Sequence, residues 1–106
     1  VLSNLLGNAI KYTPRGGRIW IRAEASSSEV VVSVSDTGIG IPPSDLPYIF
    51  EKFYRVRDAR VADQEGSGLG LAIVKSVIAE LGGRVWAEST LNKGSTFFFS
   101  LPLAGP

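Results

Sequence analysis

The chain has 106 residues, of which 44% are apolar, and its formal net charge is +1 at pH 7. These values predict a single domain with one ordinary core over residues 1–106, and the scattered basic residues argue against a nucleic-acid partner. The absence of Cys excludes disulfides and cysteine metal sites, and the absence of His excludes histidine-based catalysis within the chain. No apolar run approaches the roughly 20 residues of a membrane-spanning helix, so we expect no direct membrane contact.

The chain opens on a helical pattern. Apolar residues recur at helical spacing from Val1 to Ile10, and Thr13-Pro14 followed by Gly16-Gly17 ends that pattern. Val1 has no capping residue before it, so we expect the chain to be a fragment truncated at its N-terminus.

Two strands are predicted next. Residues 18–24 alternate between apolar and polar side chains, the serine run 26–28 turns the chain, and Val30, Val32 and Val34 share one face of a second strand. The two strands are expected to form a hairpin.

The second half of the chain predicts an irregular segment, a helix and a second hairpin. Pro42-Pro43-Ser44-Asp45 predicts the start of a short helix, and residues 56–67 are polar and without period, which is typical of a loop. A wide apolar stripe predicts a second long helix that Gly82-Gly83 ends, followed by two strands at 84–89 and 95–101. The stripe comprises Leu69, Ile73, Val74, Val77, Ile78 and Leu81. Helices and antiparallel hairpins in this order predict an α+β fold, a two-layer sandwich with a mixed, mostly antiparallel sheet and helices on one face.

Four polar residues form a stripe beside the apolar face of the first helix, at about 100° per residue. Asparagine amide oxygens suit Mg²⁺, which prefers hard oxygen ligands, and a lysine nearby can neutralise phosphate charge. A polar, half-exposed helix edge explains the same stripe, and on these residues alone it is the better explanation. The four are Asn4, Asn8, Lys11 and Tyr12.

Asp36 has the parity of Val30, Val32 and Val34, so its carboxylate is expected to point toward the core layer. A buried carboxylate needs a donor, and the amino group of adenine is one, whereas guanine presents a carbonyl there. Gly38 and Gly40 are expected to turn the backbone with positive φ and to approach a planar base closely. The alternative is a common Asp-Thr-Gly turn, but the inward parity favours a binding role.

Gly66, Gly68 and Gly70 precede the second long helix. A helix N-terminus offers free N–H groups and a positive dipole end, which favour phosphate, although a flexible loop explains the glycines equally well one by one. The spacing G-x-G-x-G without a preceding strand argues against a Rossmann site, and there is no Walker A motif. Ser95 shares parity with Phe97 and Phe99, so its hydroxyl either supports Asp36 or is satisfied internally.

These segments together resemble the catalytic, ATP-binding domain of bacterial sensor histidine kinases, in the GHKL superfamily with the Bergerat fold. The resemblance covers nearly the whole chain. It lies in four boxes, N, G1, F and G2, and in a final Gly94–Phe97 motif. The boxes are Asn4–Tyr12, Asp36–Gly40, Phe50–Arg55 and Gly66–Leu71.

The resemblance implies ATP and Mg²⁺ as ligands, with Asn8 on the metal and Asn4 nearby. It implies that Lys11 and Arg55 lie near the phosphates, Tyr12 near the nucleotide and Asp36 on the adenine amino group. Residues 56–67 would form the ATP lid, which is expected to order on ligand binding. The remaining implied nucleotide contacts are Gly38, Gly40, Ile41, Gly66, Gly68, Leu69, Gly70, Leu71 and Ser95.

Two positions distinguish branches of this superfamily. The gyrase, Hsp90 and MutL branches carry a Glu general base where this chain has Asn4, and the ATPase branches usually carry Asp at Lys11. Because an amide cannot act as a base at neutral pH, we expect slow intrinsic ATP hydrolysis and histidine kinase chemistry.

The phosphoacceptor histidine and its helical hairpin are absent from this sequence. We therefore expect the fragment to bind Mg-ATP as a monomer and to transfer phosphate to a histidine-bearing dimerisation domain of the same kinase, with a response regulator downstream. We expect a cytoplasmic location, with a parent protein anchored in the bacterial inner membrane as an option. Two alternatives stay open: a degenerate, non-enzymatic binding module, and a GHKL ATPase or chaperone fragment.

Overall fold

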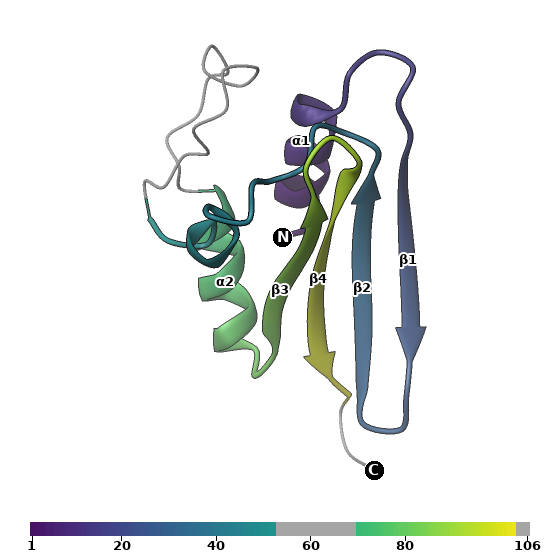
Figure 1. The fold of residues 1–106 in the computed structure, drawn as a ribbon. Helices are drawn as coiled ribbons and strands as arrows, with labels where there is room; N and C mark the ends of the chain where they lie inside the picture. Colours follow the sequence, from purple (N-terminus) through teal and green to yellow (C-terminus); the bar gives the residue numbers. More distant parts are fainter. Residues whose placement is uncertain (53–69, 104–106) are drawn as a thin grey trace.

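A computed structural model of the chain describes residues 1–52 and 70–103 (Figure 1). The elements alternate between helices and antiparallel hairpins, as the sequence predicts. In chain order they are α1 (Leu2–Tyr12), β1 (Ile19–Ala25), β2 (Glu29–Asp36), the 3₁₀ helix η1 (Leu46–Tyr48), α2 (Gly70–Glu80), β3 (Arg84–Thr90) and β4 (Gly94–Pro102).

The strands form one sheet in the order β1-β2-β4-β3, so the two hairpins meet where β2 pairs with β4. All three described pairings are antiparallel, although the sequence allowed for a mixed sheet. Val34 marks the centre of the register, because it lies between Ile21 of β1 and Phe97 of β4. The α+β class predicted from the sequence is confirmed, with β1 at the sheet edge farthest from α2 (Figure 1).

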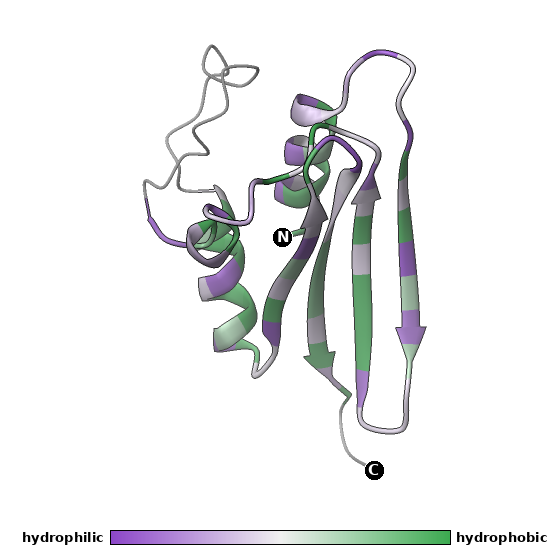
Figure 2. Ribbon diagram, viewed as in Figure 1, coloured by the Kyte–Doolittle hydropathy of each residue, from purple (hydrophilic) through white to green (hydrophobic). Residues whose placement is uncertain are grey.

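One face of the sheet packs against both helices and carries the core. Val34 and Phe97 from the sheet meet Leu5 from α1 and Val74 from α2, and each of these side chains is at most 6% exposed. Alternation follows the pleat, so β1 shows apolar and polar bands in turn (Figure 2). The core therefore joins α1 and α2 to the central strands.

Helix α1 ends where the sequence predicts. Thr13 is its C-cap and has extended dihedrals, φ −101° and ψ 118°, as expected for a residue that precedes proline. Helix α2 ends in a Schellman motif, in which the N–H of Gly83 bonds the carbonyl of Ile78 and the N–H of Gly82 bonds that of Ala79. Gly82 has a φ of +82°, a conformation that favours glycine.

The predicted short helix is confirmed as the 3₁₀ helix η1, which begins at Leu46 with Asp45 as its N-cap. A separate turn precedes it, in which the carbonyl of Pro42 accepts the N–H groups of Asp45 and Leu46.

One detail differs from the sequence-based prediction. The apolar stripe of α2 is only half buried. Val74 and Ile78 are in the core, whereas Ile73, Val77 and Leu81 are 39–56% exposed because they lie on the row turned away from the sheet.

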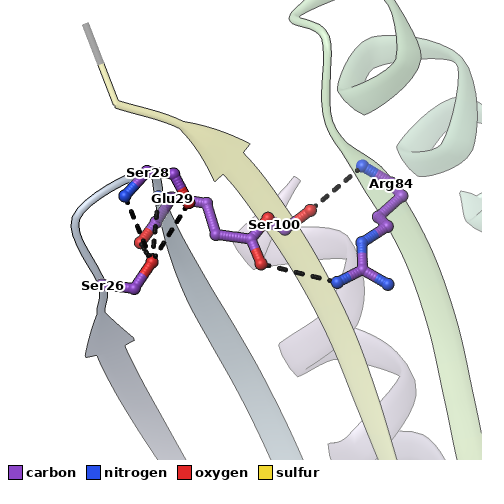
Figure 3. A network of polar contacts seen from close by, with 5 residues as sticks. All are labelled: Ser26, Ser28, Glu29, Arg84 and Ser100. Carbon is purple, nitrogen blue, oxygen red and sulfur yellow. Dashed lines mark hydrogen bonds and ion pairs between the residues drawn. The ribbon is translucent and has the colours of Figure 1, made fainter. Parts of the chain in front are cut away.

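The outer face of the sheet carries polar and aromatic side chains. Trp86 stacks on Phe98 with ring centroids 5.0 Å apart, and the Arg84 guanidinium lies 4.5 Å from the Trp86 centroid. Arg84 also pairs with Glu29 across β4 at 3.4 Å, beside the serines of the β1–β2 turn (Figure 3). This ion pair is largely exposed, so it adds little stability.

Leu5→Ala tests the core. Leu5 is 1% exposed, and its truncation should lower the free energy of unfolding by about 2–5 kcal/mol, measured by urea denaturation. Ile10→Ala is the matched control on the same helix. Because Ile10 is 67% exposed, the control should change stability by no more than about 0.5 kcal/mol. Equal losses in both variants would contradict the assignment of this core.

Candidate nucleotide-binding site

Asp36 is the last residue of β2, and its side chain lies on the face that the helices cover. It pairs in register with Ile19 of β1 and Ser95 of β4, and it is 8% exposed. The inward orientation predicted from strand parity is therefore confirmed.

The Asp36 carboxylate uses one oxygen to hold the protein. Its Oδ1 accepts the N–H of Gly38 at 2.8 Å and the N–H of Ser95 at 3.3 Å. Within residues 1–52 and 70–103, no hydrogen bond reaches Oδ2. Burial raises the pKa of the Asp36 carboxyl above its ordinary value, and the two backbone hydrogen bonds oppose that effect. One oxygen of a buried acid thus stays available as an acceptor.

The loop after β2 packs against the end of α1. The N–H of Ile39 donates to the carbonyl of Tyr12 at 3.3 Å. A Cβ on Gly38 would clash with that same carbonyl. Gly40 has the predicted positive φ, +74°, but the prediction of a positive φ at Gly38 is wrong. Gly38 lacks a side chain because the loop and the helix approach each other closely there.

The polar stripe of α1 lies along the edge of the core. Asn4, Asn8, Lys11 and Tyr12 are all half-buried. Neither asparagine side chain makes a hydrogen bond within the described part of the chain. Both amide oxygens are therefore available as ligands, and they are the hard oxygen ligands that Mg²⁺ prefers. The Lys11 Nζ lies 5.6 Å from the Tyr12 ring centroid.

A magnesium ion here would depend on amides and on ligand oxygens. Residues 1–52 and 70–103 contain no group of three His, Cys, Asp or Glu side chains that could hold a metal. Magnesium does not need such a cage, because it usually keeps waters and binds substrate phosphates.

Ile41 and Ser95 are both buried, at 8% exposed each. The Ser95 N–H supports Asp36 directly, while its hydroxyl pairs with the hydroxyl of Ser89 at 2.8 Å. Of the two alternatives for the Ser95 hydroxyl, internal satisfaction is therefore confirmed, and the support for Asp36 comes from the backbone N–H instead. Ile41 donates its N–H to the Ser89 Oγ at 2.7 Å.

Ser89 is the residue that the sequence reasoning missed. Its place on β3 opposite Ser95 follows from the register of the second hairpin. Strand alternation would have placed Ser89 on the inner face with Val85 and Ala87, but it could not reveal hydrogen bonds to the loop after β2.

The glycine-rich segment is described only from Gly70, the first residue of α2. A Cβ on Gly70 would meet open space, and Leu71 packs partly against the core. The predicted ligands Arg55, Gly66, Gly68 and Leu69 lie outside the described residues, as does the predicted lid at 56–67.

The sequence pattern described as "Histidine kinase-, DNA gyrase B-, and HSP90-like ATPase" matches residues 1–105. The chain belongs to this ATPase family. The resemblance inferred from the boxes is therefore confirmed.

Among curated relatives of this ATPase-family chain, the sensor histidine kinase WalK of Bacillus subtilis is 44% identical over 104 residues. The adaptive-response sensory kinase SasA of Synechococcus elongatus is 47% identical over 104 residues. These alignments include 96% and 97% of the chain but only 17% and 26% of the two relatives. The chain thus spans about a fifth of their length.

Solved structures agree with the family assignment. The mycobacterial sensor histidine kinase MprB superposes with a TM-score of 0.84 at 36% identity, over 93% of this chain and 67% of that one. Full-length ShkA, solved in complex with AMPPNP, superposes with a TM-score of 0.83 at 38% identity, over 99% of this chain and 21% of that one.

No helix within residues 1–52 and 70–103 has the length and apolar character needed to span a membrane.

The raised pKa of Asp36 predicts a pH effect. The folded chain binds this proton more tightly than the unfolded chain, so the free energy of unfolding should fall as pH rises from the ordinary pKa, about 3.9, through the raised folded value. Asp36→Asn keeps an Oδ1 acceptor for Gly38 and Ser95 but carries no charge, so it should remove this contribution.

Urea denaturation from pH 4 to pH 8 measures the effect. The stability of Asp36→Asn relative to wild type should increase as pH rises from the ordinary pKa through the raised folded value, and should then level off. A relative stability of Asp36→Asn that falls with rising pH would contradict the raised pKa.

Proposed function

We propose that this domain binds Mg-ATP and presents the γ-phosphate for transfer to a histidine on a separate domain, in two-component signal transduction. The observation that carries the proposal is the buried Asp36 carboxylate, with Oδ1 held by backbone N–H groups and Oδ2 left as an acceptor. Membership of the ATPase family and similarity to sensor histidine kinases support it.

Asp36 would recognise adenine through its amino group. The amino group donates to Oδ2, whereas the guanine carbonyl would meet a second acceptor in a site where water cannot relieve the mismatch. The close packing at Gly38 and Gly40 keeps the surrounding loop at a fixed distance from α1 and from the β3–β4 turn. A planar base could then lie against backbone rather than side chains.

The phosphates would extend toward α1 and α2. Asn8 would supply an amide oxygen to Mg²⁺, with Asn4 one turn away, and Lys11 would offset phosphate charge. The first turn of α2, at Gly70 and Leu71, presents backbone N–H groups with the positive end of the helix dipole. Bound magnesium would neutralise charge that develops during phosphoryl transfer.

The chain supplies positioning but no nucleophile. It contains no histidine, and Asn4 cannot activate water as a carboxylate would. Phosphoryl transfer depends mainly on alignment and charge stabilisation, so a domain of this kind can act on an imidazole brought from elsewhere. We therefore propose slow hydrolysis in isolation.

The partners follow from the same proposal. The chain spans about a fifth of the sensor kinases it matches. We propose two protein partners for it, a histidine-bearing dimerisation domain of the same kinase and a response regulator. The isolated domain is proposed to be monomeric and to work in the cytoplasm.

A labelled-phosphate assay tests the function. The chain is mixed with γ-labelled ATP, Mg²⁺ and a histidine-bearing helical domain of a sensor kinase. Label on the histidine supports the proposal. Binding without transfer would indicate a non-enzymatic module, and rapid release of phosphate would indicate an ATPase.

Asp36→Asn should weaken ATP binding about 10- to 100-fold, because an amide donor would then face the amino group of adenine. Affinity for GTP should not fall, since the same amide can donate to the guanine carbonyl. Isothermal titration calorimetry with Mg-ATP and Mg-GTP measures both affinities. Unchanged ATP affinity in a folded variant would contradict the adenine assignment.

Asn8→Ala should abolish the Mg²⁺ dependence of ATP binding, because it removes the proposed metal ligand. The measurement is ATP affinity with and without excess chelator. Ser3→Ala, an exposed position on the same helix, should keep the full dependence. Survival of the dependence in Asn8→Ala would refute the metal assignment.

A further inference from the structure

The turn between β3 and β4 packs against the loop that follows β2, at the same end of the sheet (Figure 1). The N–H of Asn92 donates to the carbonyl of Ile39 at 2.7 Å. A Cβ on Gly40 would clash with the carbonyl of Thr90, and a Cβ on Gly94 would clash with the carbonyl of Asp36. Backbone therefore meets backbone, with no room for a side chain between them.

The hydroxyl of Ser89 also bonds both the loop after β2 and the start of β4. The Ser89 Oγ accepts the N–H of Ile41 at 2.7 Å and donates to the carbonyl of Gly94 at 3.0 Å. Ser89 has one hydroxyl hydrogen, which the carbonyl takes, so the 2.8 Å contact with Ser95 assigns the donor role to the Ser95 hydroxyl. All the hydrogen-bonding capacity of Ser89 is thus used at this junction.

Two of the hydrogen bonds of Ser89 are to residues that support Asp36. Ser89 accepts the hydroxyl of Ser95, and the N–H of Ser95 donates to Asp36 Oδ1 at 3.3 Å. Through Ile41, it fixes the far end of the loop whose Gly38 N–H donates to the same oxygen at 2.8 Å. The two donors set how the carboxylate is turned, and therefore where Oδ2 points.

We propose that Ser89 is a positioning residue for purine recognition, which it controls through the orientation of Asp36. This inference rests on the adenine-binding role proposed above for Asp36. Ser89 itself touches no ligand in this proposal. Its loss leaves the Ile41 N–H and the Ser95 hydroxyl without their acceptor, and both ends of the Asp36 support relax.

The chain offers a matched control on the other face of the same sheet. Ser35 and Thr96 make a hydroxyl–hydroxyl contact of 3.0 Å between β2 and β4, one residue along from Asp36 and Ser95. Whereas Ser89 is half-buried, Ser35 is 6% exposed, so Ser35→Ala removes a buried hydroxyl. It does so without a contact to the loop after β2.

The experiment compares wild type with Ser89→Ala, Ser89→Thr and Ser35→Ala. Affinities for Mg-ATP and Mg-GTP are measured by calorimetry, and thermal unfolding is followed in parallel. Ser89→Ala should weaken ATP binding about tenfold and leave GTP affinity unchanged, so that the preference for ATP narrows by the same factor. Ser89→Thr, which keeps the hydroxyl, should restore the preference. Ser35→Ala removes one hydroxyl contact, so it should lose stability, by less than Ser89→Ala, but keep the preference.

Each other outcome overturns the inference. Wild-type ATP preference in Ser89→Ala would show that Ser89 does not orient Asp36. An equal loss for ATP and GTP, or a loss also seen in Ser35→Ala, would show general loosening instead. In all of these cases the proposed function stands. If wild type fails to bind ATP, the proposed function fails, and the inference with it.

Discussion

A carboxylate that is 8% exposed must be held by donors, and at Asp36 those donors are two backbone N–H groups. One comes from the loop after β2 and the other from the first residues of β4. The same loop bonds the end of α1 at Tyr12. Asp36 on β2 therefore holds the loop and β4, the loop in turn holds the end of α1, and the site depends on this arrangement. The raised pKa of Asp36 shows that the two donors do not fully offset its burial.

Much of this arrangement is predictable because it follows from local rules. The pleat has a period of two, so Val30, Val32 and Val34 determine the face on which Asp36 lies. The same alternation places Ser95 with Phe97 and Phe99. Proline and glycine residues predict the ends of both long helices, because Pro14 favours an extended conformation for the residue before it and Gly82 adopts a positive φ.

The rest depends on how segments distant in sequence approach one another. The bonds of Ser89 require the register of β3 against β4 and the path of the loop after β2, which no local pattern encodes. The sequence predicts that Gly38 is needed for a positive φ, but the structure shows that a side chain at this position would clash with the carbonyl of Tyr12. Likewise, the spacing of Ile73, Val77 and Leu81 shows a helix but not which of its rows the sheet covers.

The division of the sheet into two faces has a practical consequence for spectroscopy. Trp20 and Trp86 are the two tryptophans of the chain, and both lie on the side of the sheet opposite Asp36. Trp86 is stacked on Phe98 and beside Arg84, and Trp20 has the Arg18 guanidinium 6.0 Å from its ring centroid. Their fluorescence should therefore report unfolding of the sheet, but it should change little when a small molecule binds on the face that the helices cover.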